Sequence, residues 1–171
     1  MRNIIISLIA LFFFTTIVKA QDFSYLKDID LNDTHVSQDA QEAAMECCCY
    51  LVAVRYDKKD VQRQQANEYI TQWVNKKLEV DKLVCDAISI ITGEREELVD
   101  MFLVYCAMNY MDSEQGVELS TLKQEGLLGL WEYCSNSKNK LKPTKELKLI
   151  KQYHNEGTLD QYLQDIASVS M

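Results

Sequence analysis

The chain has 171 residues, 47% of them hydrophobic, with 26 Asp and Glu against 18 Lys and Arg. That length suits one domain with a sizeable core. The formal net charge of −8 argues against nonspecific nucleic-acid binding, since such binding needs clustered positive charge. The five glycines are scattered and form no glycine-rich phosphate loop, so no nucleotide-binding motif is present.

Residues 1–20 have the pattern of a secretory signal peptide, with cleavage expected after Ala20. Arg2 precedes an apolar run, Ile4–Val18, that is shorter than the ~20 residues of a membrane span. Cleavage is therefore favoured over an anchor helix. The sequence predicts an exported protein, periplasmic or extracellular, with no stable membrane anchor. Loss of Arg2 and Lys19 would leave 16 Lys and Arg against 26 Asp and Glu, a net charge of −10.

The rest of the chain predicts an all-α fold. Residues 21–36 are acidic and aperiodic, which predicts a flexible arm ahead of one helical domain over 37–171. Apolar residues that recur at spacings of 3, 4 and 7 residues predict a first helix from Ser37 to about Tyr56 and a second from about Lys59 to Leu78. Their apolar stripes are Ala40, Ala43, Ala44, Cys47, Leu51 and Val54, then Ala66, Tyr69, Ile70, Trp73 and Val74.

A third helix is expected from about Val80 to Thr92, with Gly93 placed to end it. The β-branched residues of its LVCDAISII run leave a strand as an alternative. The fourth segment, Leu98–Met111, is apolar on nearly all sides, which predicts a helix buried at the centre.

A fifth helix is expected over about Glu118–Cys134. Gly126 and Gly129 lie inside it, where each costs about 1 kcal/mol relative to alanine. A close helix–helix approach would explain them, and a ligand-lining role is the alternative. A sixth helix follows Pro143 and ends near Asn155, and a short last helix begins after Thr158.

Short connections predict antiparallel hairpins. The sequence thus predicts six to seven helices in a compact bundle or a short irregular solenoid. No 34-residue repeat pattern is present.

Charge is distributed unevenly along the chain. From Gln21 to Glu46 there are seven acids and one lysine, whereas from Lys138 to Lys151 there are six lysines and one glutamate. The basic stretch is either an ordinary solvated surface or a patch for an acidic partner or a membrane surface. Its candidate interaction residues are Lys138, Lys140, Lys142, Lys145, Lys148 and Lys151.

Half of the six cysteines stand together in Cys47–Cys49. Because successive helix residues point 100° apart, these thiols cannot all face one side. In an exported protein, one or two disulfides from Cys47 or Cys48 to Cys106 or Cys134 are expected.

Two other interpretations of the cysteines remain open. The first is buried free thiols acting as small hydrophobic residues. The second is a soft-metal site, with copper or zinc bound by cysteines and by methionines. The methionines concerned are Met45, Met101, Met108 and Met111.

No catalytic arrangement can be recognised. His35 lies in the acidic arm, and His154 lies near a helix C-terminus, where its charge favours the helix dipole. The acids Glu94, Glu96, Glu97 and Asp100 open a helix, where acidic residues are favoured for the same reason. The sequence therefore predicts a protein that is not an enzyme and uses no cofactor.

Three stretches carry a resemblance: NEYITQWVNKKLEVD, EELVDMFLVYCAMNYM and ELKLIKQYHNEGTLDQYL. With the signal peptide they resemble small exported all-helical proteins of Bacteroidetes-type bacteria, mostly uncharacterised. The plan is also similar to the periplasmic immunity proteins of type VI secretion amidase effectors, in architecture only. The resemblance implies a fold class and carries over no functional residue.

These observations predict a non-catalytic exported protein that acts through contact with a protein partner of unknown identity, as an immunity protein does. A homo-oligomer is an open alternative. No nucleic-acid partner is expected. The rival function is soft-metal binding through the cysteines and methionines.

Overall fold

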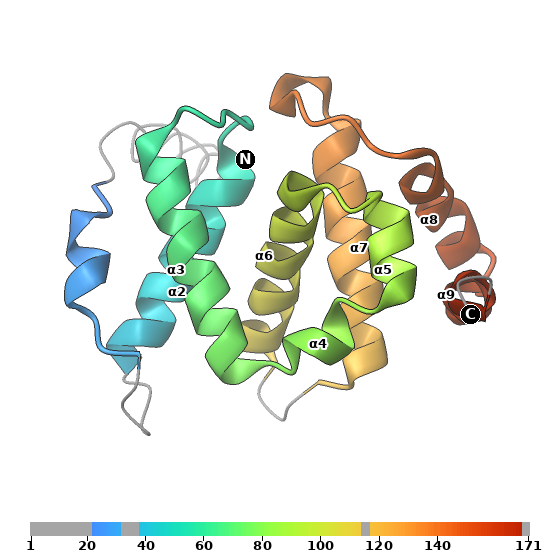
Figure 1. The fold of residues 1–171 in the computed structure, drawn as a ribbon, viewed down its shortest axis with the longest axis horizontal. Helices are drawn as coiled ribbons and strands as arrows, with labels where there is room; N and C mark the ends of the chain where they lie inside the picture. Colours follow the sequence, from blue (N-terminus) through green and yellow to red (C-terminus); the bar gives the residue numbers. More distant parts are fainter. Residues whose placement is uncertain (1–21, 32–37, 114–116, 169–171) are drawn as a thin grey trace, which may run out of the picture.

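A computed structural model describes residues 22–31, 38–113 and 117–168. Over these ranges the chain forms eight α-helices, two short 3-10 helices and no strand (Figure 1), which confirms the all-α prediction. The helices pack compactly around α6 (Glu96–Asp112). Its neighbours are α2 (Gln38–Ala53), α3 (Val61–Lys77), α5 (Asp86–Thr92) and α7 (Leu119–Ser135). The predicted signal peptide lies outside the described residues.

Residues 22–31, predicted as part of a flexible arm, instead fold against α3. They contain the 3-10 helix η1 (Ser24–Asp28), and the side chain of Phe23 is 1% exposed. The Phe23 backbone N–H donates to Gln62 Oε1 at 2.8 Å. The apolar side chains of Phe23 and Leu26 join the core, which offsets the entropy cost of fixing this acidic segment.

The predicted third helix is divided in two. A single turn, α4 (Val80–Leu83), is followed by a break at Val84 and Cys85 before α5 begins. Cys85 is extended, with φ −84° and ψ 175°, so the chain turns there. The break lets α4 pack on α7 while α5 packs on α6 and on the C-terminal helices. Gly93 ends α5 with φ 62°, as predicted.

The contact between α6 and α7 is close because α7 has two glycines facing α6. A Cβ atom added at Gly126 would lie 2.6 Å from Cys106 Sγ and 2.8 Å from Phe102 Cε2. One added at Gly129 would lie 2.2 Å from Tyr105 Cδ1. The predicted close approach is confirmed, and so is the burial of α6 at the centre of the molecule.

The C-terminal helices lie at the end of the molecule opposite η1 (Figure 1). After the 3-10 helix η2 (Ser137–Asn139) come α8 (Lys145–Asn155) and α9 (Leu159–Ser168), which pack on α5 and α7. The Thr144 hydroxyl accepts from Leu147 N at 3.0 Å, which caps α8, and donates to Ile91 O at 2.5 Å. One side chain thus starts α8 and attaches it to α5.

Candidate functional site

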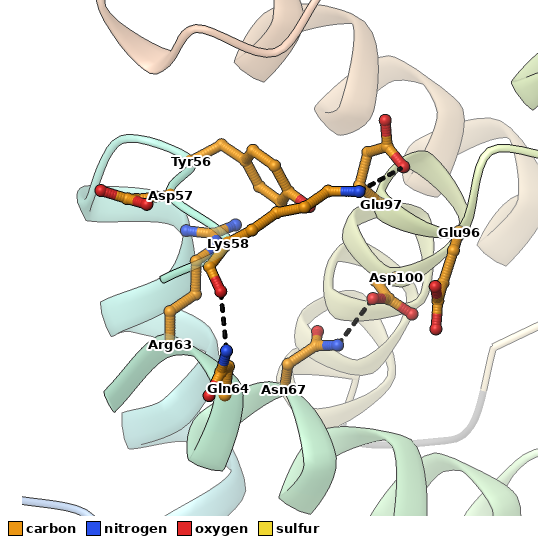
Figure 2. Close-up of a pocket in the computed structure, with 9 residues that line it drawn as sticks. All are labelled: Tyr56, Asp57, Lys58, Arg63, Gln64, Asn67, Glu96, Glu97 and Asp100. Carbon is orange, nitrogen blue, oxygen red and sulfur yellow. Dashed lines mark hydrogen bonds and ion pairs between the residues drawn. The ribbon is translucent and has the colours of Figure 1, made fainter. Parts of the chain in front are cut away.

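A polar cavity of about 280 Å³ opens between α3 and the first turns of α6 (Figure 2). The segment Tyr56–Lys58, which connects α2 to α3, forms its roof. The α3 wall is formed by Arg63, Gln64 and Asn67, and the α6 wall by Glu96, Glu97 and Asp100. Both sets recur at spacings of one and four residues, which places them on one face of each helix. We name this the α3–α6 cavity.

Arg63 is the most buried charged residue of the cavity, with a residue exposure of 5%. Its Nη1 atom donates to Leu51 O at 3.2 Å and to Val54 O at 3.5 Å, at the C-terminal end of α2. The guanidinium carbon lies 4.9 Å from the centroid of the Tyr56 ring. Arg63 therefore caps α2, and the negative end of the helix dipole and the aromatic ring partly balance its charge.

Asp100 faces α3 from the opposite wall. Its Oδ2 accepts a 2.7 Å hydrogen bond from Asn67 Nδ2. Burial raises the pKa of Asp100, and the charge of Glu96 adds to that rise, while the Asn67 bond and the Arg63 charge oppose it. This carboxylate is thus half-buried, with an amide as its hydrogen-bonding partner.

Glu97 lies in a different electrostatic environment. Its Oε1 accepts from Arg95 Nη2 at 2.8 Å and Nε at 3.1 Å, and its Oε2 lies 3.9 Å from Lys58 Nζ. Burial acts to raise the pKa of Glu97, but these two cations and the backbone hydrogen bond outweigh it and lower the pKa. Arg95 Nη1 also donates to Lys142 O at 2.7 Å. This network is neutralised and structural, and it connects α6 to the basic segment.

From the sequence, Glu96, Glu97 and Asp100 are expected only as acids at a helix start. They do occupy the first turns of α6, but they also face α3. No sequence pattern predicts a role for Arg63 or Asn67. One available sign is that Arg63 stands three residues before Ala66, on the apolar stripe of its helix.

The predicted basic stretch is an exposed surface along η2, the following loop and α8. Its exposed members, which we name the lysine face, are Lys138, Lys140, Lys142, Lys145 and Lys148. Within the described residues none of the five forms an ion pair. Lys151 is half-buried instead, with Nζ 5.7 Å from the centroid of the Trp131 ring.

The loop that carries Lys138 and Lys140 is held to the rest of the molecule. Asn139 O accepts from Tyr56 N at 2.9 Å, and Asn139 Nδ2 donates to Tyr133 O at 2.9 Å. Lys140 adopts the left-handed conformation with φ 59°, which is costly for a residue other than glycine. The lysine face is therefore presented on a fixed backbone.

All six cysteines are free. The disulfides predicted from Cys47 or Cys48 to Cys106 or Cys134 are therefore not present in the structure. Instead, Cys48 Sγ donates to Val104 O at 3.7 Å and Cys106 Sγ to Leu122 O at 3.4 Å. Burial raises the pKa of both thiols, so they behave as small core residues. Cys47 and Cys48 are buried and Cys49 is exposed, so the three thiols do not all face one side, as the 100° rotation predicts.

The described residues give no cluster of three or more His, Cys, Asp or Glu side chains able to hold a metal ion. Met101, a candidate soft ligand, accepts from Arg63 Nη2 at 2.9 Å. His154 lies in the last turn of α8, as predicted. No helix within the described ranges is both long enough and apolar enough to cross a membrane.

No protein-family model, curated protein or solved structure matches the chain. Function is therefore inferred from the cavity and from the lysine face.

Proposed function

We propose that this protein is a non-catalytic exported binding protein whose lysine face contacts an acidic protein partner. The observation that carries the proposal is the set of five exposed lysines, without ion pairs among the described residues, along one segment. The chain as a whole is acidic, with a net charge of −8. A positive face on an acidic protein attracts partners of complementary charge and orients them.

Two features support a protein partner. The loop that carries Lys140 has a fixed backbone, so little conformational entropy is lost on binding. Leu149, on the same helix as Lys145 and Lys148, is 40% exposed and offers apolar contact beside the charges. In an immunity-type role, the partner would be a secreted effector with an acidic surface.

The test is a crosslinking pull-down from envelope extract with the purified exported chain and two charge-reversal variants. Lys145→Glu with Lys148→Glu alters the lysine face. Lys27→Glu with Lys59→Glu makes the same change in charge at exposed lysines elsewhere. Circular dichroism melts verify that all three proteins fold.

We expect one acidic protein to be captured by the wild type and by the Lys27 and Lys59 control, and to be lost with the lysine-face variant. Capture should weaken as salt rises, since exposed charges are screened. Equal capture by all three proteins, or no specific capture by the wild type, would overturn the proposal.

A further inference from the structure

The two walls of the α3–α6 cavity carry opposite charges that do not neutralise each other by contact. Figure 2 shows Arg63 on the α3 side and Asp100 on the α6 side. Within the described residues no carboxylate lies within 4.0 Å of the Arg63 guanidinium. This differs from Glu97, which is paired with both Arg95 and Lys58.

Arg63 retains capacity to bind an anion. A guanidinium has five N–H donors. Nη1 donates to Leu51 O and Val54 O, and Nη2 donates to Met101 Sδ. The Tyr133 side chain also interacts with the guanidinium, and the Nε–H group takes part in none of the three hydrogen bonds to Leu51, Val54 and Met101. A ligand carboxylate is the acceptor whose planar shape fits a guanidinium best.

The opposite wall has the capacity to bind a cation. Asp100 accepts its hydrogen bond from a neutral amide, and Glu96 lies one helical turn away on the same face of α6. An ammonium group between them would gain charge-assisted hydrogen bonds in a half-buried setting. The Tyr56 ring forms part of the roof and adds an apolar surface.

We propose that the α3–α6 cavity binds a small zwitterion, an α-amino acid, with its carboxylate toward Arg63 and its ammonium toward Asp100 and Glu96. The volume of about 280 Å³ is at or below the lower end of ligand pockets, roughly 300–1,000 Å³, so the ligand is small. This site is separate from the lysine face and does not depend on the proposed function.

The test is isothermal titration calorimetry of the full exported chain with L-glutamine as the zwitterionic probe. Methylamine provides the ammonium alone, and acetate provides the carboxylate alone. The cavity variant is Asp100→Asn, which keeps the shape and the acceptor for Asn67 but removes the charge. Asp81→Asn, at an exposed acid of α4, is the matched control.

We expect L-glutamine to bind the wild type and the Asp81→Asn variant equally, and Asp100→Asn about tenfold or more weakly. Methylamine and acetate should each bind at least about tenfold more weakly than the zwitterion. Absence of binding by L-glutamine, or equal binding by Asp100→Asn, would overturn the proposal. Equal affinity for methylamine would also overturn it, because Arg63 would then have no part in binding. The Lys145→Glu and Lys148→Glu variant should bind L-glutamine normally.

Discussion

Helix α6 meets two of its neighbours, α7 and α3, in opposite ways. Against α7, the glycines bring the two helices so close that an added Cβ at Gly126 would lie 2.6 Å from Cys106 Sγ. Against α3, at the first turns of α6, charged side chains leave a cavity of about 280 Å³. The same helix therefore contributes to a closed contact on one side and an open polar one on the other.

The difference follows from what burial costs each contact. Closing the α6–α7 contact removes apolar surface from water, and the Cys106 thiol that lies in it donates a hydrogen bond to Leu122 O. Closing the α3–α6 cavity would desolvate the carboxylates of its α6 wall, and their attraction to Arg63, which is already buried, repays that cost only in favourable geometry. An open cleft is thus the arrangement expected where Arg63 and Asp100 face each other without forming an ion pair.

Adding a side chain in the α6–α7 contact should have the largest effect on stability. Gly126→Val places two methyl groups and a Cβ atom where Phe102 and Cys106, both fully buried, leave no space. Overpacking of this kind costs about 1–3 kcal/mol and occasionally more, and we expect the upper end of that range. Urea unfolding monitored by circular dichroism measures the loss. Thr121→Val adds the same residue at an exposed position of α7 and should change stability by about 0.5 kcal/mol or less. Equal stability of the two variants would show that the contact is not tightly packed.

Removing the Arg63 guanidinium from the α3–α6 cavity should have an intermediate effect on stability. Arg63→Met keeps the aliphatic bulk but leaves Leu51 O without its hydrogen bond at the end of α2. Leaving a buried carbonyl unsatisfied costs about 1–3 kcal/mol. Amide hydrogen exchange should speed up at the C-terminal end of α2, whereas the Lys59→Met control should leave it unchanged. Unchanged exchange in Arg63→Met would mean that Arg63 does not hold this helix end.

The closed contact could be predicted from the sequence, but the open one could not. Gly126 and Gly129 inside a helical pattern have few explanations, and a close approach is one of them. Cys47 and Cys48 are buried and Cys49 is exposed, and helix geometry alone predicts that the three thiols do not all face one side. Local periodicity contains this information.

The cavity depends instead on contacts between residues far apart in the sequence. Asn67 and Asp100 are separated by 33 residues, and no local pattern pairs them. The break at Val84 and the folding of Phe23 onto α3 are similar cases, since both depend on which helices meet in three dimensions. The predicted disulfides are another such case: all six cysteines are free, and helical phase does not indicate which thiols meet.

The smallest effect expected is the pH dependence of stability that arises from Asp100 in the α3–α6 cavity. The pKa of Asp100 is raised above its ordinary value of 3.8, so the folded state binds its proton more tightly than the unfolded chain. Stability from this group is therefore greatest below the ordinary pKa and falls as pH rises through the folded-state pKa. The side chains that act on the pKa of Asp100 are Asn67, through its hydrogen bond, and Glu96, Arg63 and Glu97, through their charges.

Asp100→Asn removes this dependence, so the wild type should lose stability relative to the variant as pH rises from about 4 to 7. Urea unfolding of both proteins across that range measures the difference, and a constant difference would contradict the raised pKa. At pH 7, saturating L-glutamine should reduce the difference in the free energy of unfolding between the wild type and Asp100→Asn. The reason is that its ammonium would stabilise the charged Asp100 carboxylate, which only the wild type has. If L-glutamine left this difference in the free energy of unfolding unchanged, the amino acid would not compensate the charge of Asp100.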